Sequence, residues 1–263
     1  MKTWMTCMLL VSIGIVHAQI DPDEQKAADQ GDAESQFGVG NEYMQGKDVP
    51  KDYAKAMEWF KKAADQSNAD AEGSIGVLYF SGWGVPKDCA KGLEWFIKAA
   101  DRGASDDETF VGNVYLKGYP GVPQDYGKAM EWYKKAAAQG WCSAMLAIGD
   151  MYSAGQGVPK DPAQAVDWYK KADGPGFDQA EIRLGDIYEQ GKGVPKDYAQ
   201  AMQWYWKAAK QGNADAEQAV GRMYEKGEGV QQDSAEAKRW YDKAAGQKKS
   251  EAAPAPDAAP AAK

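Results

Sequence analysis

Apolar and polar positions follow a pattern of about 36 residues that recurs six times along the chain. A clear copy runs from Gly176 to Gln211, GFDQAEIRLGDIYEQGKGVPKDYAQAMQWYWKAAKQ. Its first half has apolar residues at Ala180, Leu184, Ile187 and Tyr188, and these spacings place them on one face of a helix. Its second half, after a Gly-Lys-Gly-Val-Pro segment, repeats small and aromatic residues in the same way. The pattern predicts two amphipathic helices, A and B, joined by an elbow.

One tryptophan in helix B marks the period, with steps of 36, 37, 36, 36 and 36 residues. A fixed period between 20 and 50 residues indicates a stacked-repeat fold. We therefore predict six units, at residues 31–66, 67–102, 103–139, 140–175, 176–211 and 212–247, with the tryptophans buried in the core between units. These tryptophans are Trp59, Trp95, Trp132, Trp168, Trp204 and Trp240.

A glycine stands in the middle of every predicted helix A, where it costs about 1 kcal/mol relative to alanine. Helix B has alanine or glycine at one fixed position, so we expect the two backbones to cross closely there, small residue against small residue. The helix A glycines are Gly40, Gly76, Gly112, Gly149, Gly185 and Gly221. The helix B positions are Ala56, Gly92, Ala129, Ala165, Ala201 and Ala237.

The elbow carries end signals for both helices. Gly191 follows helix A, where a left-handed C-terminal cap is favoured, and Pro195 disfavours helix in the residue before it. Asp197 then precedes helix B as its expected N-cap. In the fourth unit Pro162 follows Asp161, and the first helical position is where proline is tolerated. The same slot holds Asp52, Asp88, Asp125 and Asp233.

The repeated consensus A-x-A-x-x-x-L-G-x-x-Y-x-x-G-x-G-V-P-x-D-x-x-x-A-x-x-W-Y-x-K-A-A resembles the Sel-one-like repeat (SLR), a relative of the tetratricopeptide repeat. The resemblance covers about four fifths of the chain. It implies an all-α fold, a right-handed α-solenoid of six helix-turn-helix repeats, and a role as an adaptor for protein complexes. Some secreted relatives carry a cysteine pair in every repeat, and this chain departs from that pattern.

The first 18 residues are typical of a secretory signal peptide. Lys2 provides the positive start, residues 8–16 form a short apolar run, and Val16-His17-Ala18 matches a cleavage site. Because a membrane-spanning helix needs about 20 apolar residues, we predict no membrane insertion and a secreted or periplasmic protein. Residues 19–30 are expected to form a partial capping helix for the first unit.

The last residues, 248–263, alternate alanine and proline without large apolar side chains. Such a composition cannot form a packed core, so we predict a disordered tail. The tail is either an inert terminus or a spacer to another envelope component.

Charge and residue usage narrow the possible chemistry. The net charge of −8 becomes −9 once Lys2 is removed, which disfavours nucleic acid and anionic lipid and favours a neutral or basic protein partner.

His17 is the single histidine and lies in the predicted signal peptide, so histidine-based catalytic sites are not expected. Cys89 and Cys142 are too few for a structural zinc site; they are either small buried or half-buried thiols or form an intermolecular disulfide. We predict no catalytic residues, metal or cofactor.

Three aromatic residues break the repeat and are candidate binding residues. Trp141 and Phe177 stand where other units have small or polar residues, and Trp206 stands where helix B usually has a lysine. Exposed aromatic residues are frequent hot spots of protein interfaces. Local packing against a neighbouring unit or against the C-terminal tail explains them almost as well.

A second candidate surface is a mostly polar row to which helix A of each unit contributes one residue. In the related tetratricopeptide solenoids helix A lines the groove, so by analogy this row binds an extended peptide; the alternative is an ordinary solvated face. The row consists of Asn41, Val77, Asn113, Asp150, Asp186 and Arg222.

These observations favour an exported, non-catalytic scaffold that binds a protein or an extended peptide. The alternative is a cell-envelope hydrolase acting on a β-lactam or peptidoglycan-like substrate. A third hypothesis is a purely architectural spacer.

Overall fold

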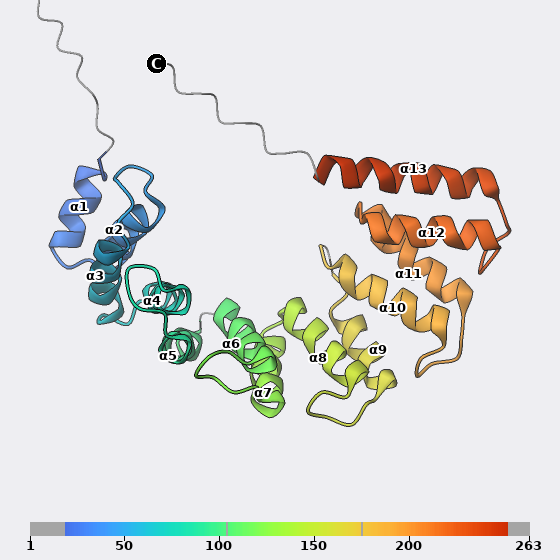
Figure 1. The fold of residues 1–263 in the computed structure, drawn as a ribbon, viewed down its shortest axis with the longest axis horizontal. Coiled ribbons are helices and arrows are strands. Elements are labelled where there is room, and N and C mark those ends of the chain that lie inside the picture. The colour runs from blue at the N-terminus through green and yellow to red at the C-terminus, as the bar shows by residue number, and fades with distance from the viewer. Residues whose placement is uncertain (1–18, 104, 175, 252–263) are drawn as a thin grey trace, which may run out of the picture. The chain divides into compact units, whose positions relative to one another are not determined.

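The computed structural model describes residues 19–103, 105–174 and 176–251, and most of these residues are helical (Figure 1). The predicted signal peptide and residues 252–263 of the predicted tail lie outside the described part. The helices are α1 (Pro22–Asp29), α2 (Ala33–Gln45), α3 (Tyr53–Ala64), α4 (Ala69–Ser81), α5 (Cys89–Asp101), α6 (Ser105–Lys117), α7 (Tyr126–Ala138), α8 (Cys142–Ala154), α9 (Pro162–Lys171), α10 (Asp178–Gln190), α11 (Tyr198–Lys210), α12 (Ala214–Lys226) and α13 (Ser234–Glu251).

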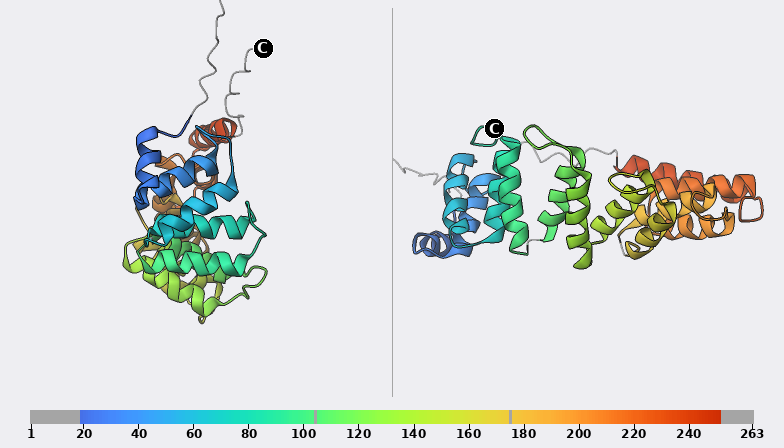
Figure 2. Two further views of the ribbon diagram at one scale, coloured as in Figure 1. Left: turned by 90° about the vertical axis from the view of Figure 1, so that its left-hand side faces the viewer. Right: turned by 90° about the horizontal axis from the view of Figure 1, so that it is seen from below.

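The chain divides into two compact units, residues 1–104 and 105–263. The first contains α1 to α5 and the second contains α6 to α13. Within each unit every helix packs against the next one in sequence, as the side-by-side helices of Figures 1 and 2 show. Even-numbered helices α2 to α12 are the predicted A helices, and odd-numbered helices α3 to α13 are the B helices. The α-solenoid class is confirmed.

The hydrophobic core is a series of clusters, each made by helix B of one repeat and helix A of the next. In the cluster between α11 and α12, for example, Met202 and Tyr205 pack with Val220 and Met223. Equivalent clusters join α3 to α4, α7 to α8, and α9 to α10. Stacking on the neighbouring repeat therefore buries much of the apolar surface of each repeat.

Helix α1 packs on α2 of the first repeat as each helix B packs on helix A of the next repeat. Its Ala28 is buried with Val39 of α2, and Ile20 from the segment before α1 joins the same cluster. The short helix thus covers an apolar face of α2.

The mid-helix glycines serve a different neighbour from the one predicted. A Cβ atom at Gly185 would come 2.5 Å from Cε1 of Tyr205, and at Gly149 the same distance from Cε1 of Tyr169. The space left by the glycine is therefore filled by an aromatic ring of helix B. Backbone against backbone, as predicted, occurs in two repeats besides the ring contact. A Cβ at Gly76 would lie 3.1 Å from the carbonyl oxygen of Gly92, and a Cβ at Gly221 would lie 3.2 Å from that of Ala237.

The six tryptophans are less buried than predicted. All six are half-buried, whereas the next residue in five of the repeats is a buried aromatic ring: Phe60, Phe96, Tyr133, Tyr169 or Tyr205. The tryptophans do pack between repeats, as Trp204 does against the cluster of α9 and α10. Their outer faces each carry the lysine three residues later, with the ammonium nitrogen 3.6 to 5.4 Å from the ring centroid. Periodicity alone does not distinguish the buried ring from its half-buried neighbour, because the apolar stripe of a packed helix is about 100° wide or more and includes both positions.

The elbow and caps form as predicted. Gly191 ends α10 in the left-handed region, with φ of 70°. Asp161 begins α9 and accepts hydrogen bonds from the backbone N–H groups of Ala163 (3.1 Å) and Gln164 (3.0 Å). The second elbow glycine also has a packing role, because a Cβ at Gly193 would come 2.2 Å from Cβ of Pro162 in the preceding repeat.

The last helix extends beyond the predicted boundary at residue 247. Helix α13 continues to Glu251. Residues 248–253 include neither glycine nor proline, and the first helix-breaking residue is Pro254.

Candidate binding face

The polar row of helix A lies where helix B tyrosine hydroxyls meet helix A. Tyr133 donates to Oδ1 of Asn113 (2.8 Å), and Tyr169 donates to Oδ1 of Asp150 (2.7 Å). Each ring is buried against the glycine next to the row residue, so only the hydroxyl end reaches the polar side chain. We call this series, including the two later tyrosines below, the tyrosine ladder.

In the fifth repeat the ladder includes a second carboxylate. The Tyr205 hydroxyl lies 2.6 Å from Oδ1 of Asp186 and 2.7 Å from Oε2 of Glu189. Glu189 is also paired with Arg222 of the next repeat, at 2.7 Å. Because Arg222 cannot accept a hydrogen bond, Tyr241 of the sixth repeat donates instead to Glu225 (2.9 Å).

The tyrosine hydroxyls are held in the protonated, donating form. Burial, and then the hydrogen bond to Asp150, raise the pKa of Tyr169 well above its ordinary range. Burial and the carboxylates of Asp186 and Glu189 raise the pKa of Tyr205 in the same way. These hydroxyls therefore orient the carboxylates and do not act as bases at neutral pH.

Two of the predicted row residues share a cavity of about 380 Å³ that α8 and α10 line together with Tyr169 of α9 and the elbows. Nε of Arg183, on α10, lies 3.2 Å from Oδ1 of Asp150 on its wall. The lining includes Asp150, Ser153, Tyr169, Arg183, Asp186, Gln190 and Lys192.

The structure therefore connects the three polar residues predicted as binding residues. Asp150 and Asp186 line one cavity, and Asp186 is linked to Arg222 through Tyr205 and Glu189. Sequence reasoning missed the ladder and Arg183. A signal was present: in the first two repeats, with Asn41 and Val77 in the row, the ring is phenylalanine, whereas from the third repeat onward it is tyrosine.

The off-pattern aromatic residues lie elsewhere. Trp141 directly precedes α8 and is half-buried against the cluster of α7 and α8, so local packing accounts for part of its surface. Phe177 precedes α10 and is also half-buried. Trp206 is 40% exposed, and the Lys210 ammonium lies 3.9 Å from its ring centroid. None of the three lines the cavity of Asp150 and Asp186.

A second exposed aromatic group belongs to residues 1–104. Trp83 in the elbow after α4 is 43% exposed, and its ring is stacked on Tyr53 of α3, with centroids 5.2 Å apart.

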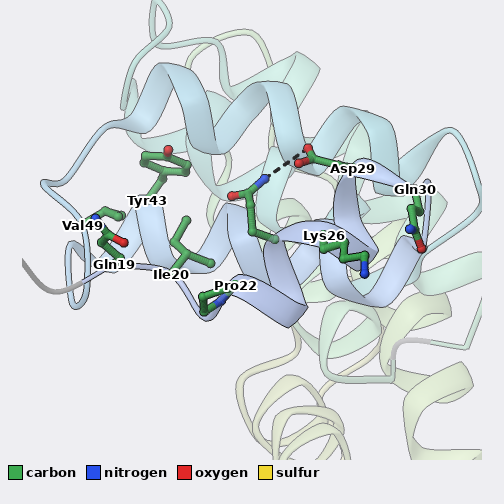
Figure 3. Close-up of a pocket in the computed structure, with 9 residues that line it drawn as sticks. Gln19, Ile20, Pro22, Lys26, Asp29, Gln30, Tyr43 and Val49 are labelled. Atoms are coloured by element: carbon green, nitrogen blue, oxygen red, sulfur yellow. Dashed lines mark hydrogen bonds between the residues drawn. The ribbon is translucent and has the colours of Figure 1, made fainter.

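A larger hollow of about 640 Å³ lies beside α1 (Figure 3). Ile20, Tyr43 and Val49 contribute its apolar part. On α1, Nε2 of Gln25 donates a hydrogen bond to Oδ1 of Asp29 at 3.1 Å. It contains none of the residues predicted to bind a partner, and its charged residues, Lys26 and Asp29, lie on one short helix.

A buried carboxylate in helix A recurs for a structural reason. Oε2 of Glu181 accepts from Nε2 of Gln211 (2.8 Å) at the end of helix B, and Oε2 of Glu72 pairs with Arg102 (2.8 Å) in the same way. Glu181 also meets Asp173 and Lys207, and burial followed by the hydrogen bond with Asp173 raises the pKa of Glu181. These acids hold the two helices of a repeat together.

Other chemistry is sparse among the described residues. No group of three or more His, Cys, Asp or Glu side chains there could hold a metal ion. Cys89 is buried, Cys142 is half-buried, and both thiols are free. Within the same part of the chain, no helix combines the length and apolar character needed to cross a membrane.

Repeated helix pairs, a shared elbow and cores between successive repeats define an α-solenoid. Residues 33–68, 69–103, 107–141, 142–172, 178–213 and 214–248 each match the Sel1 repeat, and the chain belongs to the Sel1 repeat family. Proteins of this family are generally scaffolds for protein interactions and are generally non-catalytic.

Two solved structures are similar over most of this chain. One is c5321, a protective antigen present in uropathogenic Escherichia coli strains, with 35% identity, 86% of this chain covered and a TM-score of 0.79; the chain spans 48% of its length. The other is a Sel1 repeat protein from Oxalobacter formigenes, with 36% identity, 86% of this chain and 91% of that chain covered, and a TM-score of 0.70. No curated protein matches the chain.

Proposed function

We propose that this protein is an exported, non-catalytic scaffold that binds a neutral or basic protein segment along the polar row of helix A in residues 105–263. The observation that carries the proposal is the tyrosine ladder. It holds Asn113, Asp150 and Asp186 in fixed orientations, one repeat apart, on a family of folds that generally serves protein interaction. Preorganised polar groups bind with a smaller loss of conformational entropy than mobile ones.

Trp141, Phe177 and Trp206 belong to the proposal as additional contacts outside the row. Exposed aromatic surface contributes strongly to protein interfaces, and Trp206 offers such surface together with Lys210. Alanine at each of the three positions is expected to leave helical circular dichroism intact and to weaken partner binding.

Site-specific photocrosslinking tests the binding face. Gln190 is exposed and lines the cavity, and Gln203 is an exposed glutamine on α11 that does not line it. A photoreactive amino acid at residue 190 is expected to crosslink a partner from envelope or extracellular fractions, and excess unlabelled protein should compete. The same probe at residue 203 should give little product. The captured partner is then purified and its binding measured directly; equal crosslinking from both positions, or none from residue 190, would reject this face.

Export is tested separately. The N-terminal residue of the protein recovered from the periplasm or medium is expected to be Gln19, because the predicted cleavage follows Ala18. Recovery of the intact chain in the cytoplasm would contradict export and leave the binding proposal unaffected.

A further inference from the structure

The carboxylates of the tyrosine ladder differ in how their charge is balanced. Asp150 is paired with Arg183, and Glu189 with Arg222. Asp186, in contrast, has the neutral hydroxyl of Tyr205 as its hydrogen-bond partner among the described residues. Its side chain is half-buried on the wall of the cavity. Asp186 is thus oriented by a neutral donor and has no ion pair in the described part of the protein.

Two cationic side chains, Arg183 and Lys192, already line the cavity. Arg183 pairs with Asp150 there, and their side chains are 46% and 45% exposed. Ion pairs this exposed are worth about 0–1 kcal/mol, so an incoming group can displace Arg183 readily. The volume of about 380 Å³ lies near the lower end of the ~300–1,000 Å³ of small-ligand pockets, which suits one long side chain.

We propose that this cavity is an anchor site for a single arginine or lysine side chain of an extended partner, with Asp186 as the main contact and Asp150 as the second. This inference rests on the proposed scaffold function and names the chemistry of its partner. The amide of Gln190 lies on the same wall to orient the cationic group. The overall charge of −8 favours the approach of such a segment.

The decisive variant is Asp186→Asn. Asn113 accepts the Tyr133 hydroxyl at 2.8 Å with its amide oxygen, so asparagine at residue 186 preserves the bond from Tyr205 and removes only the charge. Asp167→Asn is the matched control, because Asp167 is exposed on α9 and does not line the cavity. Arg183→Gln removes the cation that pairs with Asp150 and leaves Lys192 in place.

The probe is N-acetyl-arginine methylamide, with N-acetyl-citrulline methylamide as its neutral isostere, titrated into the isotope-labelled protein and followed by NMR. We expect shifts at Gln190 for the arginine probe, at least about tenfold weaker binding in Asp186→Asn, no change in Asp167→Asn and several-fold tighter binding in Arg183→Gln. Added salt should weaken binding. Equal binding of the neutral isostere, no binding of either probe, or insensitivity to Asp186→Asn would overturn the proposal.

The same variants separate this proposal from the scaffold function. Partner crosslinking at residue 190 that persists unchanged in Asp186→Asn would overturn the basic anchor and leave the scaffold intact. Arginine binding in the cavity with no crosslinked partner would support the cavity's chemistry and contradict the scaffold.

Discussion

The ring of Tyr133 lies in the space that Gly112 leaves open on the facing helix. A Cβ atom at Gly112 would come 2.6 Å from Cε1 of Tyr133, which is too close for two carbon atoms that are not bonded to each other. The ring is fully buried, and its hydroxyl continues past the glycine to Asn113. The glycine and the tyrosine thus form one packing unit that also sets the position of the polar row.

Alanine at Gly112 should therefore destabilise the protein despite its better helix propensity. Forcing a methyl group into this contact typically costs about 1–3 kcal/mol. Gly127→Ala is the control, because Gly127 lies in α7 of the same repeat at a position where other repeats have alanine, such as Ala163 and Ala199. That change should stabilise by up to about 1 kcal/mol. Urea unfolding followed by circular dichroism measures both; a stabilising Gly112→Ala would mean that the ring moves aside freely.

The fully buried ring should matter more than the tryptophan beside it. We expect Tyr169→Ala to lose about 3–5 kcal/mol, as for large buried aromatic residues. Trp168→Ala should lose less, about 1–3 kcal/mol, because the ring is half-buried. Lys171→Ala, which removes the cation 4.0 Å from the Trp168 ring, should lose about 0.5–1 kcal/mol. The reverse order of the two aromatic variants in thermal or urea unfolding would contradict the assignment of the core.

Loss of a helix cap should have a defined, modest effect. Asp197 accepts the backbone N–H of Gln200 at 3.0 Å, and replacing such a cap by alanine typically destabilises by about 1 kcal/mol. Asp167→Ala removes the same charge from the middle of α9 and should stay within about 0.5 kcal/mol of the parent. Equal losses in the two variants would show that charge, rather than capping, is responsible.

Glu181 should give stability a pH dependence that glutamine removes. Burial and the hydrogen bond with Asp173 raise the pKa of Glu181 above its ordinary 4.5, against the opposing effect of Lys207. The stability gained from its protonated form is therefore present at low pH and is lost as the pH rises through the raised pKa. Glutamine at residue 181 can still accept from Gln211, as Gln36 accepts from Gln66 at 2.9 Å.

The difference in melting temperature, Glu181→Gln minus parent, should thus become more positive between about pH 4 and pH 7. The control is Glu131→Gln at an exposed position of α7, for which the difference should stay flat. A difference for Glu181→Gln that falls with rising pH would mean that the charged form is the stabilised one.

The sequence by itself determined the repeat, the helix pairs, the elbows and the aspartate caps, because these depend on neighbours within about one turn or on a period counted along the chain. Gly191 and Asp161 could be assigned from their position alone. Only the tertiary structure decided which of two adjacent aromatic residues, Trp168 or Tyr169, is fully buried, and that the glycine opposite makes room for a ring. It also decided that Asp150 and Asp186, a full repeat apart, line one cavity with Arg183. Those relations depend on how two helices approach each other in space, and residues on the same face of a helix are distinguished only by what packs against them.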